Sequence, residues 1–213
     1  MKPYFVDERA GITIYHGDCA EVMPELGKFD LLLTDPPYGI GESSKKASTR
    51  VQMAAPKDYG HHDWDQEPVA QEVMDLARSV ARWQIIWGGN YYFLPPCSGP
   101  LIWDKENSGD FADGEMAWNN LGKALRIKRH RWNGMIRKGQ EERFHPTQKP
   151  LDVILWALSH APDTVQTVLD PWMGSGTTLR ACKDTGKRCV GIDIEERYCE
   201  IAARRLEQEV FAL

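Results

Sequence analysis

The sequence lacks the cysteine patterns of disulfide-rich and zinc-binding proteins. Its 5 cysteines are odd in number, scattered along the chain and never spaced as a Cys-x-x-Cys pair. This distribution argues against a disulfide framework and against a structural zinc site. We therefore expect reduced thiols, as in an intracellular protein, and no bound metal ion.

Long hydrophobic runs are also missing. No stretch is long and apolar enough to span a bilayer, and residues 1–10 lack the apolar core of a signal peptide. We expect a soluble protein without a membrane partner.

Positive charge is scarce overall, with 26 Lys and Arg against 31 Asp and Glu and a net charge of −5. That balance is unlike a typical nucleic-acid binder, because contacts to phosphate need Lys and Arg. Residues 123–143 are the exception, since they hold eight basic residues against only Glu141 and Glu142. Two interpretations stay open for this basic segment: a solvated charged face, or a surface that contacts phosphates.

The chain is long enough for one well-buried domain and short for two, with 213 residues and 42% hydrophobic content. We expect a single domain over residues 1–213. Apolar runs alternate with helix-like segments, which predicts an α/β fold with a mostly parallel sheet between helices. The predicted strands are 12–15, 29–33, 84–87, 101–103, 165–169 and 189–192, and the predicted helices are 67–82, 151–159, 177–184 and 195–209.

The stretch Asp35-Pro36-Pro37-Tyr38 directly follows a predicted strand. Ligands of open α/β sheets bind at the carboxyl ends of the strands. Proline has no N–H, so this turn offers acceptors to an amino group. The Asp35 carboxylate and the Pro36 carbonyl could hold both hydrogens of an exocyclic amine, and Tyr38 offers a face for stacking a base. The alternative is a tight strand-ending turn with a tyrosine at the core edge.

A second chemical motif is the glycine-rich turn of residues 170–177, between a predicted strand and a predicted helix. Glycines let a ligand approach the backbone, and helix N-termini attract anions. A nucleotide-binding P-loop is excluded, because Thr177-Thr178 stands where that motif has Lys followed by Ser or Thr. About twenty residues further on, Asp193 ends the next strand, where such folds hold ribose hydroxyls.

These motifs carry a family resemblance. Residues 35–38 resemble the catalytic motif of the amino-methylating DNA methyltransferases, and Asp at the first position is more similar to the adenine-N6 members than to the cytosine-N4 members. Residues 170–176 resemble the S-adenosylmethionine motif, with Trp172 where Phe is usual. The target-base motif comes first and the cofactor motif last, as in the permuted β-type members. The resemblance implies a Rossmann-like methyltransferase fold, circularly permuted in motif order, with helices on both faces.

The resemblance also implies roles for individual residues. Asp170 would face the methionine amino end, Asp193 the ribose and Asp18 the adenine amino group of S-adenosylmethionine. Asp18 as a turn residue and Thr147 as a helix cap stay as alternatives. The implied catalytic residues are Asp35, Pro36, Pro37 and Tyr38. The implied cofactor-binding residues are Asp18, Asp35, Thr147, Gln148, Lys149, Asp170, Pro171, Trp172, Gly174, Ser175, Gly176, Thr177, Asp193 and Ile194.

The expected partner is double-stranded DNA. The chain has no room for a separate target-recognition domain, so we expect DNA contacts from two loops, residues 39–62 and 117–143. The candidate DNA-binding residues are Lys123, Arg126, Lys128, Arg129, Arg131, Arg137 and Lys138.

The expected reaction is methylation of adenine N6 in DNA. We expect the protein to be a homodimer in the bacterial cytoplasm, or in the cytoplasm of the host cell if a phage encodes it. Three alternatives remain: a cytosine-N4 methyltransferase, a methyltransferase for RNA or a protein amide, and a catalytically silent DNA-binding module.

Overall fold

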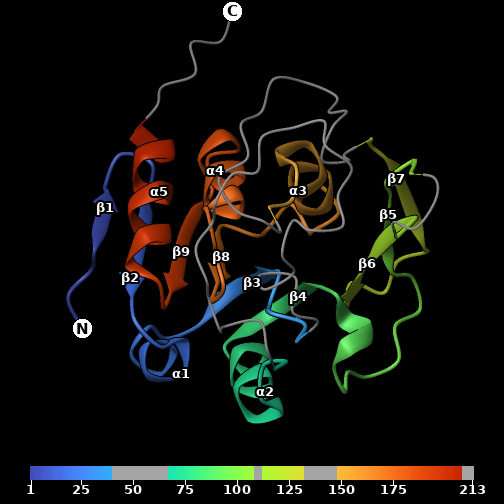
Figure 1. Cartoon of the computed structure of the whole chain (residues 1–213), viewed down its shortest axis with the longest axis horizontal. Helices are drawn as coiled ribbons and strands as arrows, with labels where there is room; N and C mark the ends of the chain where they lie inside the picture. The colour runs from blue at the N-terminus through green and yellow to red at the C-terminus, as the bar shows by residue number, and fades with distance from the viewer. Residues whose placement is uncertain (40–66, 108–111, 132–147, 208–213) are drawn as a thin grey trace, which may run out of the picture.

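Nine strands form one mixed sheet in the order β1-β2-β9-β8-β3-β4-β6-β5-β7 (Figure 1). The computed structural model describes residues 1–39, 67–107, 112–131 and 148–207. All strands except β1 and β6 point the same way, because only the pairings of those two strands are antiparallel. The strands are β1 (Phe5–Asp7), β2 (Ile12–His16), β3 (Phe29–Thr34), β4 (Ala81–Trp87), β5 (Leu101–Asp104), β6 (Gly114–Asn119), β7 (Arg126–Arg129), β8 (Thr167–Asp170) and β9 (Arg188–Asp193).

Helices cover both faces of this sheet (Figure 1). The alternation of side chains along β3 shows why: Leu31 and Leu33 pack into the core beneath α3, α4 and α5, whereas Leu32 packs on the opposite side with α1 and α2. Each of these leucines is fully buried, and such burial stabilises by roughly 1.5–3 kcal/mol per side chain. The helices are α1 (Cys19–Val22), α2 (Gln71–Ser79), α3 (Leu151–Leu158), α4 (Thr177–Asp184) and α5 (Glu196–Glu207), with the 3₁₀ helices η1 (Met23–Glu25) and η3 (Gly89–Tyr91).

The parallel strands bring chemically active residues to one edge of the sheet. Strands β8 and β9 end at Asp170 and Asp193, and β3 ends at Thr34, immediately before Asp35. Because these strands pair in parallel, their carboxyl ends lie at the same edge. The two sequence motifs, which lie far apart in the chain, therefore meet at a common site, as the expected fold requires.

Most predicted elements are present, with ends shifted by one or two residues. The clearest difference is the predicted helix 67–82, which is only residues 71–79, because β4 already begins at Ala81. Ala81 pairs with Phe29 of β3, so sheet pairing ends the helix earlier than its apolar spacing suggests. The expected α/β fold with helices on both faces is confirmed.

The prediction of a loop over residues 117–143 is wrong for part of this range. Residues 117–119 finish β6, and residues 126–129 form β7, which pairs in parallel with β5. The sequence hides β7 because it is a basic strand at the end of the sheet order, with Arg126, Ile127 and Arg129 exposed. Of the other predicted loop, 39–62, only Gly39 lies within the described residues. No helix of the described part of the chain is long and apolar enough to cross a membrane.

One carboxylate joins β3 to the start of β8. Asp30 Oδ2 accepts hydrogen bonds of 2.9 Å from the backbone N–H of Gln166, the backbone N–H of Thr167 and the Thr167 hydroxyl. These bonds favour the ionised form and lower the pKa of Asp30.

We predict that Asp30→Ala lowers the free energy of unfolding by about 1–2 kcal/mol, since charge-assisted hydrogen bonds are lost. A carboxylate whose pKa is lowered in the folded state stabilises above its unfolded pKa, about 3.9, and loses this effect as the pH falls through the folded value. The difference between variant and wild type should therefore shrink below about pH 4. Urea titrations at several pH values measure it, with the exposed Asp163→Ala as control; equal losses in both variants would contradict the assignment.

Candidate active site

Two stacked tyrosines line the turn after β3. The Tyr38 ring lies parallel to the Tyr91 ring, with centroids 4.8 Å apart and an interplanar angle of 10°. The Tyr38 hydroxyl donates to Asp35 Oδ1, and the Tyr92 hydroxyl donates to the Pro37 carbonyl. The turn that follows β3 is thereby fastened to η3, which follows β4, and an aromatic wall stands beside the Asp35 carboxylate.

Gly88 makes this close approach possible. Its φ of +64° is disfavoured for other residues, and a Cβ built there would lie 2.0 Å from Tyr38 Cε1. The glycine therefore serves both a left-handed turn and the packing of the Tyr38 ring.

Lys149 lies on the other side of Asp35. Its ammonium is 2.5 Å from Asp35 Oδ2 and 2.9 Å from Glu115 Oε2, and it donates to the Tyr38 hydroxyl over 3.2 Å. Glu115 also forms an ion pair with Lys105. Lys149 is only 5% exposed, and a buried ammonium is tolerated where carboxylates pair with it. The four side chains form an alternating charge network of Asp35, Lys149, Glu115 and Lys105.

The network shifts the pKa of its members. Burial raises the pKa of Asp35, and the Lys149 ammonium opposes this effect. Burial acts on Glu115 in the same direction, but the ammonium groups of Lys149 and Lys105 lower its pKa to about 2. Burial disfavours the charge of Lys149, yet the two carboxylates raise its pKa. Glu115 and Lys149 are accordingly charged at neutral pH.

The glycine-rich turn follows β8 and is held by two aspartates. Asp170 is 3% exposed and accepts from the Thr34 hydroxyl over 2.7 Å and from the Trp172 N–H over 3.3 Å. Asp193 accepts from the N–H groups of Gly174 and Glu195, both over 2.9 Å. Burial raises the pKa of Asp170 to about 6 and that of Asp193 to about 7. Neither carboxylate has a cationic partner among the described residues that would offset this effect of burial on its pKa.

A buried arginine supports the turn from behind. Arg205 of α5 donates to the Ser175 carbonyl over 2.5 Å and to the Ser175 hydroxyl over 3.0 Å, and Ser175 donates to Gln148 Oε1 over 3.1 Å. Gln148, Ser175 and Thr177 are buried. The structure thus places these predicted cofactor residues inside the wall of the site, and Arg205 is a supporting residue that the sequence did not reveal.

The remaining predicted site residues lie in varied places. Asp18 accepts from the Ala20 N–H over 2.8 Å and caps α1, and Ile194 is 60% exposed at the end of β9. Pro171 is buried, and Trp172 is partly exposed at the turn. Thr147 lies outside the described residues.

Five of the predicted DNA-binding residues can be placed. Arg126, Lys128 and Arg129 belong to β7, and Lys123 and Arg131 are exposed near its ends. Arg129 Nε is 3.3 Å from Asp104 Oδ2 at the carboxyl end of β5, and Lys123 donates to the His160 carbonyl. Arg137 and Lys138 lie outside the described residues.

Sequence reasoning missed the roles of Glu115 and Lys105. The one available signal was the acid that opens the apolar stretch Glu115-Met116-Ala117-Trp118. This acid indicates no role by itself, because nothing local shows that β6 brings it beside residue 149.

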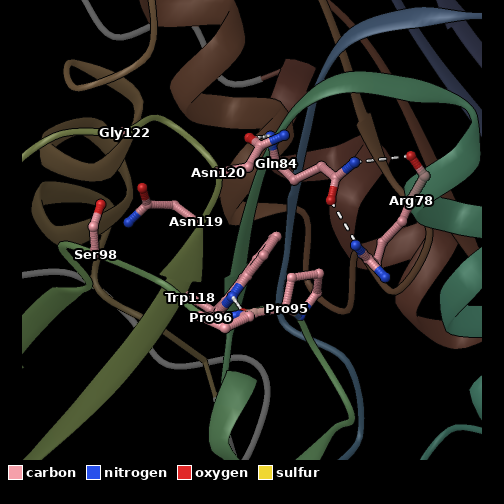
Figure 2. Close-up of a pocket in the computed structure, with 9 residues that line it drawn as sticks. All are labelled: Arg78, Gln84, Pro95, Pro96, Ser98, Trp118, Asn119, Asn120 and Gly122. Atoms are coloured by element: carbon pink, nitrogen blue, oxygen red, sulfur yellow. Dashed lines mark hydrogen bonds between the residues drawn. The ribbon is translucent and has the colours of Figure 1, made fainter.

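A separate polar pocket lies between α2, β4 and the end of β6 (Figure 2). Its polar side chains bind one another: Arg78 Nε donates to Gln84 Oε1, Gln84 Nε2 donates back to the Arg78 carbonyl, and Asn120 Oδ1 accepts from the Gln84 N–H. These bonds hold the helix and strands together, so we assign the pocket a structural role. Among the described residues, no group of three or more His, Cys, Asp or Glu side chains could hold a metal ion.

The sheet order, the glycine turn and the acidic strand ends define a Rossmann-like methyltransferase fold. Two solved structures share it: the complex of M1.HpyAVI with SAM, at a TM-score of 0.59 and 20% identity over 92% of this chain and 100% of that one, and the PvuII DNA methyltransferase (cytosine-N4-specific), at a TM-score of 0.61 and 11% identity over 99% and 91%. At these identities, the likeness concerns the fold alone.

Sequence comparison finds similarity to one family of DNA methyltransferases. Residues 102–204 match the N6/N4 DNA methylase family model. The chain is 27% identical over 269 residues to the type II methyltransferase M.ScaI of Streptomyces caespitosus, covering 100% of this chain and 86% of that protein. It is 24% identical over 258 residues to M2.LlaDCHI of Lactococcus lactis subsp. cremoris, covering 97% and 93%. These matches support the resemblance to the N6-adenine/N4-cytosine DNA methyltransferases noted in the sequence.

We predict that Gly88→Ala destabilises the protein by roughly 2–4 kcal/mol, because it combines an unfavourable φ with a clash against Tyr38. Gly27 is the matched control, since it has a φ of +80° and nothing within 4 Å of a built Cβ. Gly27→Ala should cost only the conformational part, roughly 1 kcal/mol. Urea unfolding of both variants measures the difference; similar losses would mean that Tyr38 does not need the space at Gly88.

Proposed function

We propose that this protein transfers a methyl group from S-adenosylmethionine to the exocyclic N6 of an adenine flipped out of duplex DNA. The observation that carries the proposal is the Asp35 carboxylate beside the Tyr38–Tyr91 stack, at the same sheet edge as the glycine turn. Asp35 supplies an acceptor for an amino group, and the stacked tyrosines supply a face for a base. The glycine turn supplies a place for the methyl donor.

The residues after β8 and β9 fit S-adenosylmethionine by their chemistry. This cofactor carries a cationic sulfonium, an ammonium group and a ribose diol, and supplies an activated methyl group when bound. Asp170 and Asp193 are buried carboxylates with raised pKa values, so a cationic ligand nearby would favour their ionised forms. Asp193 would hold the ribose diol, and the partly exposed Trp172 would provide an apolar wall.

Asp35 would act on the substrate amine by orientation. An exocyclic amino group is a poor nucleophile, because its lone pair is delocalised into the ring. The Asp35 carboxylate and the Pro36 carbonyl would accept its two hydrogens and turn the lone pair toward the methyl group. The Tyr38 hydroxyl now donates to Asp35 Oδ1, so an incoming amino group would replace one donor by another. Positioning of this kind supplies much of the rate of group transfer.

Cytosine N4 is the second candidate target. The same acceptors would hold a cytosine amino group, and the adenine preference depends on Asp at position 35, where Ser or Asn is the mark of the cytosine-N4 members. The expected homodimer and cytoplasmic location stay predictions.

The first test is the reaction of purified protein with S-adenosylmethionine and mixed-sequence duplex DNA, followed by nucleoside mass spectrometry. We expect N6-methyladenine from the wild type. Asp35→Ala should lower the rate by about 10³-fold, since an acceptor for the reacting amine is lost, while cofactor affinity changes little. Calorimetry with the cofactor is the control. Formation of N4-methylcytosine would change the base, and rapid turnover by Asp35→Ala would refute its role.

The exposed basic residues around β7 are proposed to contact phosphates. Arg129→Glu combined with Arg131→Glu should weaken DNA binding and lower the slope of log affinity against log salt by about 2. Lys28→Glu combined with Arg188→Glu is the control, because it makes the same charge change at exposed positions near the amino ends of β3 and β9. Fluorescence anisotropy at several salt concentrations measures both. Equal weakening would show that net charge, and not this surface, governs binding.

A further inference from the structure

The ammonium group of Lys149 lies between two carboxylates and two aromatic rings of the protein. Three oxygen atoms lie around the ammonium group: it forms ion pairs with Asp35 Oδ2 at 2.5 Å and Glu115 Oε2 at 2.9 Å, and it donates a hydrogen bond to the Tyr38 hydroxyl over 3.2 Å. The ammonium is also 5.2 Å from the Trp87 ring centroid and 5.6 Å from that of Tyr38. These partners belong to the turn after β3, to β4 and to β6, and not to the glycine turn after β8, whereas the resemblance implies a cofactor role.

The backbone around Lys149 is fixed by its place in the fold. Pro150 is the N-cap of α3, and its carbonyl accepts from the N–H groups of Val153 and Ile154. Helix α3 packs into the main core through Val153, Ile154 and Ala157. The lysine therefore enters the site from a rigid support, which is what a residue needs to hold another in place.

We propose that Lys149 is a positioning residue that holds Asp35 ionised and oriented toward the substrate, and that Glu115 in turn holds Lys149. The proposal rests on the function proposed above and assigns Lys149 to the half of the site that binds the base.

The geometry supports this division of roles. Lys149 binds Oδ2 of Asp35, which fixes the rotation of the carboxylate and leaves Oδ1 on the side of the Tyr38 hydroxyl. That hydroxyl marks the direction from which a donor reaches Asp35. Without the ammonium, the carboxylate could rotate and would lose its only cationic neighbour within ion-pair distance among the described residues.

Glu115 completes the arrangement. Asp35, Lys149, Glu115 and Lys105 alternate in sign, so their formal charges sum to zero. A buried ion pair is stable only when its members are well paired, and removing one member leaves an uncompensated charge. Glu115 and Lys105 thus keep Lys149 in place without neutralising the pair that Lys149 forms with Asp35.

The titratable groups that face Asp35 set the direction of a pH effect on the rate. They are Lys149 before α3, Glu115 on β6, Tyr38 on its own turn and Asp170 at the end of β8. Of these, only Lys149 favours the ionised carboxylate by its charge. Its removal raises the pKa of Asp35 further, so the acid limb of the rate profile moves to higher pH.

The test compares Lys149→Met with Lys149→Arg, Glu115→Gln and the control Lys28→Met, whose lysine lies before β3 and donates to the Ser79 carbonyl. Lys149→Met should lower kcat about 100-fold and leave the cofactor Kd nearly unchanged. Its acid limb should rise by about one pH unit, so that high pH restores part of the rate. Lys149→Arg should restore more activity, and Glu115→Gln should lie between wild type and Lys149→Met. Weaker cofactor binding with an unchanged kcat would overturn the proposal.

A measurement without catalysis separates this inference from the proposed function. Lys149→Met should lower Tm by about 10 °C, because buried carboxylates lose their cation. Adding Asp35→Asn should restore part of that loss, because the carboxylate left without its cation is removed as well. If the wild type methylates no nucleoside, the proposed function fails. The Tm values of the single and double variants still test whether Lys149 pairs with Asp35. If the wild type is active and Asp35→Asn restores nothing, the inference fails alone.

Discussion

The parallel pairing of β3 with β8 is the constraint on which the site depends. Leu31 pairs with Val168 and Leu32 with Leu169, which joins an N-terminal strand to one that follows more than a hundred residues later. The hydrogen bond from the Thr34 hydroxyl to Asp170 joins the last residues of the two strands. Because both strands run the same way, the turn after β3 and the glycine turn after β8 open at one edge. Without this register, the acceptor for the amine and the proposed cofactor site would not meet.

A second constraint follows from burial at that edge. Asp35 is partly buried beside Tyr38, Glu115 and Lys149, and partial burial already makes an isolated carboxylate less favourable. Lys149, which directly precedes the N-cap of α3, compensates the charge of Asp35 and itself forms an ion pair with Glu115. The site is therefore assembled from the ends of β3, β6 and α3, and no one of these elements can be displaced without leaving a buried charge unpaired.

These two constraints differ in how far the sequence reveals them. Strand ends and the motifs beside them are local, so the apolar run before Asp35 and the glycines after Asp170 predicted the fold and brought both halves of the proposed site to one sheet edge. The Lys149–Asp35 pair depends on how α3 meets β3, and the place of Glu115 depends on β6 lying between β4 and β5. No local pattern encodes such contacts. Strand β7 was missed for a related reason, since its pairing with β5, and not its basic composition, makes it a strand.

The carboxylates of the site differ in a way that suits the proposed reaction. Asp35 has its cation supplied by the protein, whereas Asp170 and Asp193 form no ion pair with a Lys or Arg among the described residues. A neutral amino group brings no charge of its own, so a cationic side chain of the protein must keep the accepting carboxylate ionised. A sulfonium cofactor brings its charge with it, so the carboxylates near it need no cation from the chain. The distribution of lysines thus separates the base half from the cofactor half, and it places Lys149 with the base.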